Sequence, residues 1–210
     1  MFRFLRGAGK WYSKTLDAHP FKMNVAMSTV ITAAGDGLAQ LYEHYAGWKG
    51  DEKSGFSPNL RRLASMGVFG AAFIGPVGHY WYTGLDQFVR KRFVVNSFPF
   101  IASKVLMDIT IFGPTLLLFF FGGVTILEGQ GVQAAREKLE NDYVPTAILD
   151  AASWVPIQVI NFRFVPVRHH LLVVNVFTFL EDIGLSLAEH NGITWPDWVP
   201  QVHFGDSANK

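Results

Sequence analysis

The sequence predicts an all-α fold, a polytopic bundle of helices that spans a membrane about four times, with helices kinked at glycine and proline. Half of the 210 residues are hydrophobic and 15% are aromatic, whereas 17% are charged. A typical soluble domain is about 25% charged, so this chain lacks the charge of a water-facing surface. Its 20 glycines and long uncharged segments indicate helices that pack in lipid. The mean hydropathy of +0.20 is low for helices that meet lipid alone, and it predicts a polar interior.

Composition and motifs argue against an enzyme. The chain has no cysteine, which excludes disulfide scaffolds and cysteine–zinc sites. His169 and His170 are adjacent, so a helix points them in different directions, and no His/Glu set has metal-ligand spacing. Neither a phosphate-binding glycine loop nor a nucleophile elbow occurs. We therefore expect no catalytic residue, no metal and no cofactor. The net charge of +1 predicts no nucleic-acid surface.

We divide the chain into three parts: a basic N-terminal arm at residues 1–22, a transmembrane bundle at 23–187, and a polar, aromatic C-terminal tail at 188–210. The first fourteen residues hold four basic residues and no acid. They fit either a mitochondrial address that stays attached or a cationic anchor on a membrane surface. The tail is expected to lie along the membrane surface or against a neighbour.

Two apolar segments are the clearest candidate spans. A hydrocarbon core about 30 Å thick needs roughly 20 apolar helical residues, and residues 109–127 form an uncharged run of about that length. Residues 63–85 form the second run. It ends in Tyr80, Trp81 and Tyr82, aromatic residues that we expect at the level of the lipid headgroups.

Two further segments complete the predicted bundle. Residues 23–42 are apolar apart from Asp36. Residues 144–187 are long enough for two helices, or for one span and one interfacial segment, and the sequence leaves this open.

The connections between these segments differ in charge. Residues 90–92 are basic, like the N-terminal arm, whereas residues 128–142, interpreted as a loop, are net acidic. Lys and Arg near span ends favour the cytosolic or matrix side of a membrane. The arm and residues 90–92 are therefore expected on the same side.

Small residues in the second span predict close helix packing. Gly67, Ala71 and Gly75 recur every four residues, a spacing that lets two helix backbones approach in lipid. Pro76 follows directly and is expected to kink the helix, because proline cannot donate the helical hydrogen bond.

Charged residues also lie within or at the ends of the apolar segments. The three acids are Asp36, Asp108 and Asp150. Charges at membrane depth are costly, about 3 kcal/mol on insertion scales, so they face the bundle interior or water and find partners. Lys104 lies four residues before Asp108 and is expected to pair with it on one helix face. The partners expected for the other two acids are Arg163 and Arg168. Two interpretations remain open: structural ion pairs, or the lining of a hydrophilic path.

Residues 150–170 are apolar but carry two prolines and several polar side chains. One helix face is expected to hold Trp154, Gln158, Asn161, Phe162 and Val165. Amides that face a bundle interior hydrogen-bond across helices. Pro156 and Pro166 are expected to break the helical hydrogen bonding and kink the segment. The complete predicted set of pore-lining or buried polar residues is Asp36, Gln40, Lys104, Asp108, Asp150, Gln158, Asn161, Arg163 and Arg168.

Several blocks along the chain match the pattern of one family. The first part of the chain supplies Trp11, Tyr12, Leu16, His19, Pro20, Gly35, Asp36 and Gln40. The middle supplies Arg61, Arg62, Gly67, Gly75, Pro76, His79, Trp81, Tyr82, Leu85, Lys104, Asp108 and Pro114. The last block, the most diagnostic, supplies Trp154, Pro156, Gln158, Asn161, Phe162, Val165, Pro166 and Arg168. Over residues 10–187 the chain thus resembles the 22-kilodalton peroxisomal membrane proteins and their mitochondrial inner-membrane relatives.

The chain departs from that pattern at three places. Ile109 follows Asp108 where the family usually has Gln, Val155 stands where it has a second Trp, and Glu181-Asp182 replaces a Trp-Asn pair. The resemblance implies a small four-helix-type membrane protein that forms or modulates a weakly selective pore for small solutes. It implies the mitochondrial inner membrane, or alternatively the peroxisomal membrane, and no enzymatic activity. Membrane lipids are the expected partners. The alternative function is an accessory or structural subunit of a larger mitochondrial membrane complex.

Overall fold

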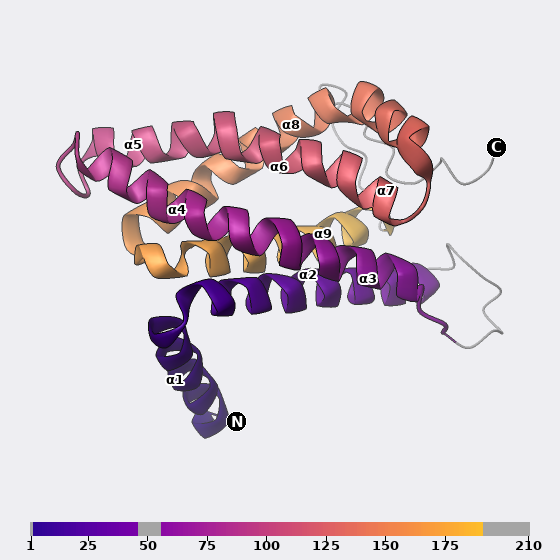
Figure 1. Ribbon diagram of the computed structural model, residues 1–210, viewed down its shortest axis with the longest axis horizontal. Coiled ribbons are helices and arrows are strands. Elements are labelled where there is room, and N and C mark those ends of the chain that lie inside the picture. Colours follow the sequence, from indigo (N-terminus) through magenta and orange to yellow (C-terminus); the bar gives the residue numbers. More distant parts are fainter. Residues whose placement is uncertain (1, 46–55, 191–210) are drawn as a thin grey trace.

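The computed structural model describes residues 2–45 and 56–190, and within them the chain is helical, with no β-strand (Figure 1). The all-α prediction is confirmed for this part of the chain. The predicted C-terminal tail lies outside it, except for residues 188–190, which end the last helix. The helices are α1 (Phe2–Ala18), α2 (Pro20–Tyr45), α3 (Leu60–Phe69), α4 (Gly75–Arg90), α5 (Phe98–Met107), α6 (Gly113–Phe119), α7 (Thr125–Leu127), α8 (Gly131–Phe164) and α9 (His170–His190). Four short turns complete the set: η1 (Gly70–Ile74), η2 (Asp108–Phe112), η3 (Phe120–Val124) and η4 (Val167–His169).

Two of the long helices contain π-helical turns. Elements α3, η1 and α4 run on as one helix, and α5 to α7 run on as another, Phe98–Leu127. At two of these turns a Gly-Pro pair follows. The N–H of Gly75 bonds to the carbonyl of Gly70, and the N–H of Gly113 to that of Asp108, each five residues earlier. The wider turn makes room for the proline that comes next, which has no N–H to donate. The kink expected at Pro76 is thus accommodated by a π-turn within an unbroken helix.

Helix α2 lies against most of the bundle. It packs on α3, η1 and α4 along one side and on α9 along another, while α4 meets α5 and the helix α5–α7 lies against α8 (Figure 1). Helix α1 leaves the bundle at a steep angle to α2 (Figure 1). The buried apolar core between the helices includes Phe69, Leu85, Val89, Phe100, Phe112, Phe162, Leu171 and Val174.

The contact between α2 and α3–α4 depends on two glycines. A Cβ added at Gly75 would lie 2.6 Å from the Cα of Val25, and one added at Gly70 would lie 2.8 Å from the carbonyl oxygen of Ser28. At Gly67 the nearest atom would be 3.8 Å away, which is ordinary contact. The closest backbone approach therefore lies at Gly75, the last residue of the predicted motif, and at Gly70, which lies outside its four-residue spacing.

The last apolar region forms two helices. Residues 131–142, interpreted from sequence as part of a loop, are the first turns of α8. Helix α8 then runs through Pro156, which is exposed, and ends before Val165 and Pro166, where the backbone is extended. The expectation of two breaks is therefore wrong for Pro156 and correct for Pro166, since X-Pro disfavours the helical conformation of the residue before it.

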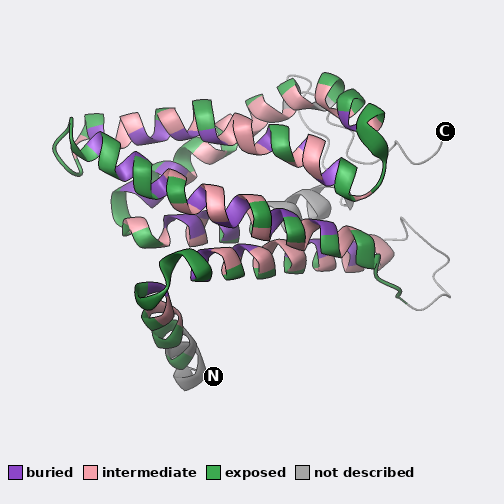
Figure 2. Cartoon of the chain, in the orientation of Figure 1, coloured by how far each residue is buried: buried purple, intermediate pink, exposed green. Residues whose placement is uncertain are grey.

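In the described part of the chain one helix, Phe98–Leu127, is both long and apolar enough to cross a membrane, with a mean hydropathy of 2.0. The predicted count of four spans is not confirmed by this measure. Of the most apolar stretch of that helix, 28% is buried in the bundle, and the rest is half-buried or exposed. The outer faces of the other helices also carry exposed large apolar side chains, among them Val30, Val68, Ile148, Ile160 and Phe177 (Figure 2).

We predict that Gly75→Ala lowers stability, because the new methyl group meets the α2 backbone and overpacking typically costs about 1–3 kcal/mol. The matched control is Gly84→Ala in the same helix, where nothing lies within 4 Å of the added Cβ. Thermal unfolding in detergent should show a lower midpoint for the first variant and an equal or higher midpoint for the second. Equal midpoints for Gly75→Ala and the unmodified protein would refute the close contact.

Candidate functional site, a buried polar network

Asp108 is the centre of a hydrogen-bonded group that joins three helices. Trp81 Nε1 donates to Asp108 Oδ1 at 2.7 Å, and Gln158 Nε2 donates to Asp108 Oδ2 at 2.7 Å. Gln158 also donates to the Tyr82 hydroxyl at 3.2 Å, and Asn161 Nδ2 donates to Gln158 Oε1 at 3.0 Å. Because the donors come from α4 and α8 and the acceptor from η2, these bonds hold the two long helices and α8 in register. The predicted inward face of α8 at Gln158 and Asn161 is buried here.

A buried cation lies beside this group. Lys104 is 1% exposed, and its Nζ donates to Asp86 Oδ1 at 2.9 Å. Arg90 approaches the other oxygen of the same carboxylate at 2.9 Å. The rings of Phe100 and Phe162 lie 5.1 and 4.8 Å from Nζ, near enough for cation–π attraction. The expected pairing of Lys104 with Asp108 is wrong, because the lysine reaches across to α4 instead of along its own helix.

Helix α2 carries a polar stripe on its inward side. Its members recur every four residues: Asn24, Ser28, Thr32, Asp36 and Gln40. All are buried except Thr32, which is half-buried. At 1.5 Å per residue the stripe is about 24 Å long, most of the thickness of a bilayer core. We call this set the α2 stripe.

Each member of the α2 stripe has partners on another element. Asn24 Nδ2 lies 2.9 Å from His79 Nδ1, and Ser28 Oγ accepts from Asn175 Nδ2 of α9 at 2.8 Å. Thr32 Oγ1 donates to the carbonyl of Met66 at 3.0 Å. The polar stripe is therefore closed by hydrogen bonds to α3–α4 and to α9.

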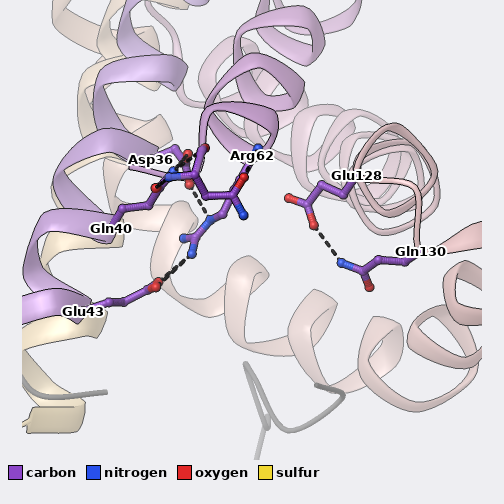
Figure 3. Close-up of polar contacts among 7 residues, drawn as sticks. Asp36, Gln40, Glu43, Arg62, Glu128 and Gln130 are labelled. Atoms are coloured by element: carbon purple, nitrogen blue, oxygen red, sulfur yellow. Dashed lines mark hydrogen bonds and ion pairs between the residues drawn. The ribbon is translucent and has the colours of Figure 1, made fainter. Parts of the chain in front are cut away.

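The far end of the stripe is an ion-paired cluster (Figure 3). Arg62 Nε lies 2.6 Å from Asp36 Oδ1, and Arg62 Nη1 lies 2.8 Å from Glu43 Oε1. Gln40 donates to Asp36 Oδ2 at 2.7 Å and accepts from the backbone N–H of Asn59 at 2.6 Å. Asn59 in turn caps α3. The cluster fastens the end of α2 to the start of α3. Beside it, Gln130 donates to Glu128 in the turn before α8 (Figure 3).

Three predicted network residues are not buried. Arg163 is exposed and donates to the backbone carbonyl of Asn96. Arg168 is exposed and pairs with Asp17 of α1. Asp150 is half-buried. The sequence predicts Arg163 and Arg168 as the partners of Asp36 and Asp150. This is wrong for Asp36, which pairs with Arg62, and for Arg168, which pairs with Asp17. Both arginines flank the break at Pro166, which places them at the end of the bundle.

Sequence reasoning missed several members of the network. Asp86 is absent from the predicted set because the predicted second span stops at residue 85. In the structure α4 continues to Arg90 and includes Asp86. Trp81 and Tyr82 were expected at the headgroup level, but Tyr82 is 2% exposed and both contact the Asp108 group. A usable signal was present: the buried residues of α4 recur at helical spacing as Gly75, Gly78, Tyr82, Leu85, Asp86 and Val89.

The buried network is built from amide, carboxylate, indole and hydroxyl groups that hydrogen-bond to one another. Among the described residues no group of three or more His, Cys, Asp or Glu could hold a metal ion. Two buried acceptors in the centre, Asn161 Oδ1 and His170 Nδ1, have no hydrogen-bond partner. The His170 Nε2 atom lies 2.9 Å from the carbonyl of Val165 and donates to it, which leaves Nδ1 of the neutral ring as an acceptor. Neither acceptor is bonded to another side chain or to the backbone of the described residues.

We predict that Asp86→Ala destabilises the protein more than Lys104→Met. Without Asp86 the lysine is a buried charge without its carboxylate, a loss of about 3–5 kcal/mol, whereas without Lys104 the carboxylate keeps Arg90. Adding Lys104→Met to Asp86→Ala should restore part of the stability. Chemical denaturation in detergent measures this, with Arg136→Ala at the exposed pair with Glu140 as a control that should cost less than about 1 kcal/mol. A larger loss of stability for Lys104→Met than for Asp86→Ala would contradict the assignment of Asp86 as the group that neutralises the buried lysine.

Comparisons with known proteins agree with this membrane-type architecture. The model of the Mpv17 / PMP22 family matches residues 125–186, which cover the end of the helix α5–α7, all of α8 and much of α9. The chain is similar to the mitochondrial inner membrane protein Mpv17 of Danio rerio, at 31% identity over 181 residues, 85% of this chain and 96% of the relative. It is also similar to protein SYM1 of Kluyveromyces lactis, at 29% identity over 95% of this chain and 97% of the relative.

A third relative is named for another organelle. Peroxisomal membrane protein 2 of Bos taurus is 28% identical over 187 residues, 85% of this chain and 90% of that protein. The two named membranes are those that the sequence resemblance implied, and none of these names is that of an enzyme. No solved structure matches the chain. The agreement in sequence along nearly the whole length leads to one conclusion: the chain belongs to the Mpv17 / PMP22 family of membrane proteins.

Proposed function

We propose that the protein is a polytopic protein of the mitochondrial inner membrane that forms or modulates a weakly selective pathway for small solutes. The α2 stripe is the observation that carries this proposal, because it places polar side chains along about 24 Å of the bundle interior. A protein that served as a simple membrane anchor would have no need of such a stripe. The relatives named for the mitochondrial inner membrane support the location, and the bovine relative supports the peroxisomal membrane as the alternative.

The proposal includes about four membrane spans. Helix α2 has 26 residues, about 39 Å at 1.5 Å per residue, and is long enough to cross. Its polar side chains lower its hydropathy, but they face the interior and are bonded there, so they do not meet lipid. The same reasoning extends to α3–α4, with Asp86 inside, and to α8, with Gln158 and Asn161 inside.

In this arrangement the pathway is closed. The α2 stripe bonds to α3–α4 and α9, and each carboxylate oxygen of Asp108 accepts a hydrogen bond from α4 or α8. Opening therefore requires these side chains to exchange their mutual hydrogen bonds for bonds to water or solute.

We predict that purified protein in liposomes raises the flux of small solutes, measured by stopped-flow light scattering with glycerol, urea and sucrose and by ion-selective currents. Asp36→Asn should shift the charge preference toward anions, since it removes a buried negative charge from the stripe. The matched control is Glu140→Gln, an exposed acid of α8. Flux equal to that of protein-free liposomes, or an unchanged preference after Asp36→Asn, would contradict the proposal.

The alternative function, an accessory subunit of a larger membrane complex, has a separate test. Mild detergent extraction from organelles followed by native electrophoresis distinguishes the two. Migration of the protein as a small free species that retains flux activity supports the pathway. Exclusive migration in a large complex, with no flux from the isolated chain, supports the subunit.

A further inference from the structure

One end of the bundle gathers exposed cations from segments that are far apart in the sequence. Helix α1 and the start of α2, the loop between α4 and α5, and the turn between α8 and α9 all lie at this end (Figure 1). Its exposed basic side chains outside ion pairs include Lys10, Lys14, Lys22, Lys91 and Arg92. We call this surface the basic end.

The acids at the basic end are already neutralised. Of those in the described residues, Asp17 pairs with Arg168, and Asp86 pairs with both Lys104 and Arg90. Burial, and then the charge of Arg168, lower the pKa of His169, so this ring stays neutral near pH 7. The cations that remain therefore give the basic end a net positive charge that its own side chains do not balance.

Large apolar side chains lie among these cations. In the loop after α4, Val94 is 80% exposed and Phe98, at the start of α5, is 84% exposed. Trp11 on α1 is 63% exposed. Such a mixture is unfavourable in water but typical of the membrane interface, where aromatic and apolar groups enter the headgroup region and Lys and Arg meet phosphate.

The two outer segments of the basic end are fastened to the bundle. Helix α1 is held by the Arg168–Asp17 pair, by a ring contact of Tyr12 with His169 at 5.7 Å, and by Leu16, which is 1% exposed. The loop after α4 is held by the bond from Arg163 to the carbonyl of Asn96. The surface is therefore organised before any lipid binds, which lowers the entropic cost of binding.

We propose that the basic end is a binding surface for the phosphate groups of anionic phospholipids, with α1 lying in the plane of the headgroups. Helix α1 projects from this end at a steep angle to α2, so it lies crosswise to the long helices and not alongside them (Figure 1). The charge of an anionic lipid complements the unbalanced cations, and the exposed apolar side chains give a lipid an advantage over free phosphate. This inference requires insertion in a membrane but not the solute pathway, so each can fail without the other.

The test measures lipid selectivity directly. The full-length protein is reconstituted in phosphatidylcholine bilayers that contain trace spin-labelled phosphatidylglycerol or spin-labelled phosphatidylcholine, and electron spin resonance gives the relative association constant of each. We expect phosphatidylglycerol to associate several-fold more strongly, and the preference to shrink at 1 M NaCl because exposed charges are screened. Lys91→Gln with Arg92→Gln should at least about halve this preference, and so should Lys10→Gln with Lys14→Gln, because each cation near the surface attracts anionic lipid.

The control removes two cations of α8 at the other end, Arg136, which pairs with Glu140, and the half-buried Lys138, in Arg136→Gln with Lys138→Gln. This variant should keep the full preference. All variants should retain the same number of motionally restricted phosphatidylcholine molecules, which shows that the bundle remains intact. Soluble glycerol 3-phosphate at millimolar concentration should not displace the lipid. The proposal is overturned if the unmodified protein does not discriminate between the lipids, or if the control loses as much preference as the variants of the basic end.

Discussion

The cost of placing polar groups away from water governs this molecule. Asp108 accepts from Trp81 and Gln158, Lys104 donates to Asp86, and Asp36 pairs with Arg62, and in each case the partners come from different helices. A lone carboxylate or ammonium at such a depth would cost several kcal/mol, whereas the paired arrangement satisfies both groups. The same contacts therefore fix which helices are neighbours and in what register. Lipid or water can cover the apolar outer faces, whereas these buried ionic and amide side chains need the partners that this packing brings to them.

Backbone geometry makes these contacts possible. Gly70 and Gly75 let α2 approach α3–α4 closely enough for the α2 stripe to reach partners on the facing backbone and side chains. The π-turns accommodate Gly-Pro pairs without breaking the helices, and one of them begins at Asp108 itself. A π-turn shifts the helical register, so residues after it face a different direction from that expected of a regular helix. Such turns are frequent at functional sites, and here one carries the acceptor at the centre of the network.

Much of the fold could be predicted from sequence, and the errors have physical causes. Gln158 and Asn161 were placed inward correctly because a regular helix runs through them. The i,i+4 spacing of Lys104 and Asp108 predicts an ion pair along one helix, but this spacing rule takes no account of partners on other helices. In the structure the carboxylate of Asp86 on α4 is the partner of Lys104, and Arg90 binds the same carboxylate. Arg163 and Arg168 are predicted in the interior as charge partners for the acids of the apolar segments, although a break is expected at Pro166. Because α8 ends at that break, Arg163 binds the loop after α4 and Arg168 binds α1 instead. Hydropathy does not distinguish an inward polar side chain from one that faces lipid, so it gives α2 the same value whichever way the α2 stripe points.

The central claim is that the carboxylate of Asp108 is bonded across helices to side chains of α4 and α8 inside the bundle. Magic-angle-spinning NMR of the isotopically labelled protein in lipid bilayers addresses it, through dipolar transfer between the carboxyl carbon of Asp108 and side-chain nitrogens. The account predicts cross-peaks to the Gln158 amide and to the Trp81 indole, and no transfer from lipid acyl protons. A cross-peak to the Lys104 ammonium in place of these two, or strong transfer from acyl chains, would contradict it.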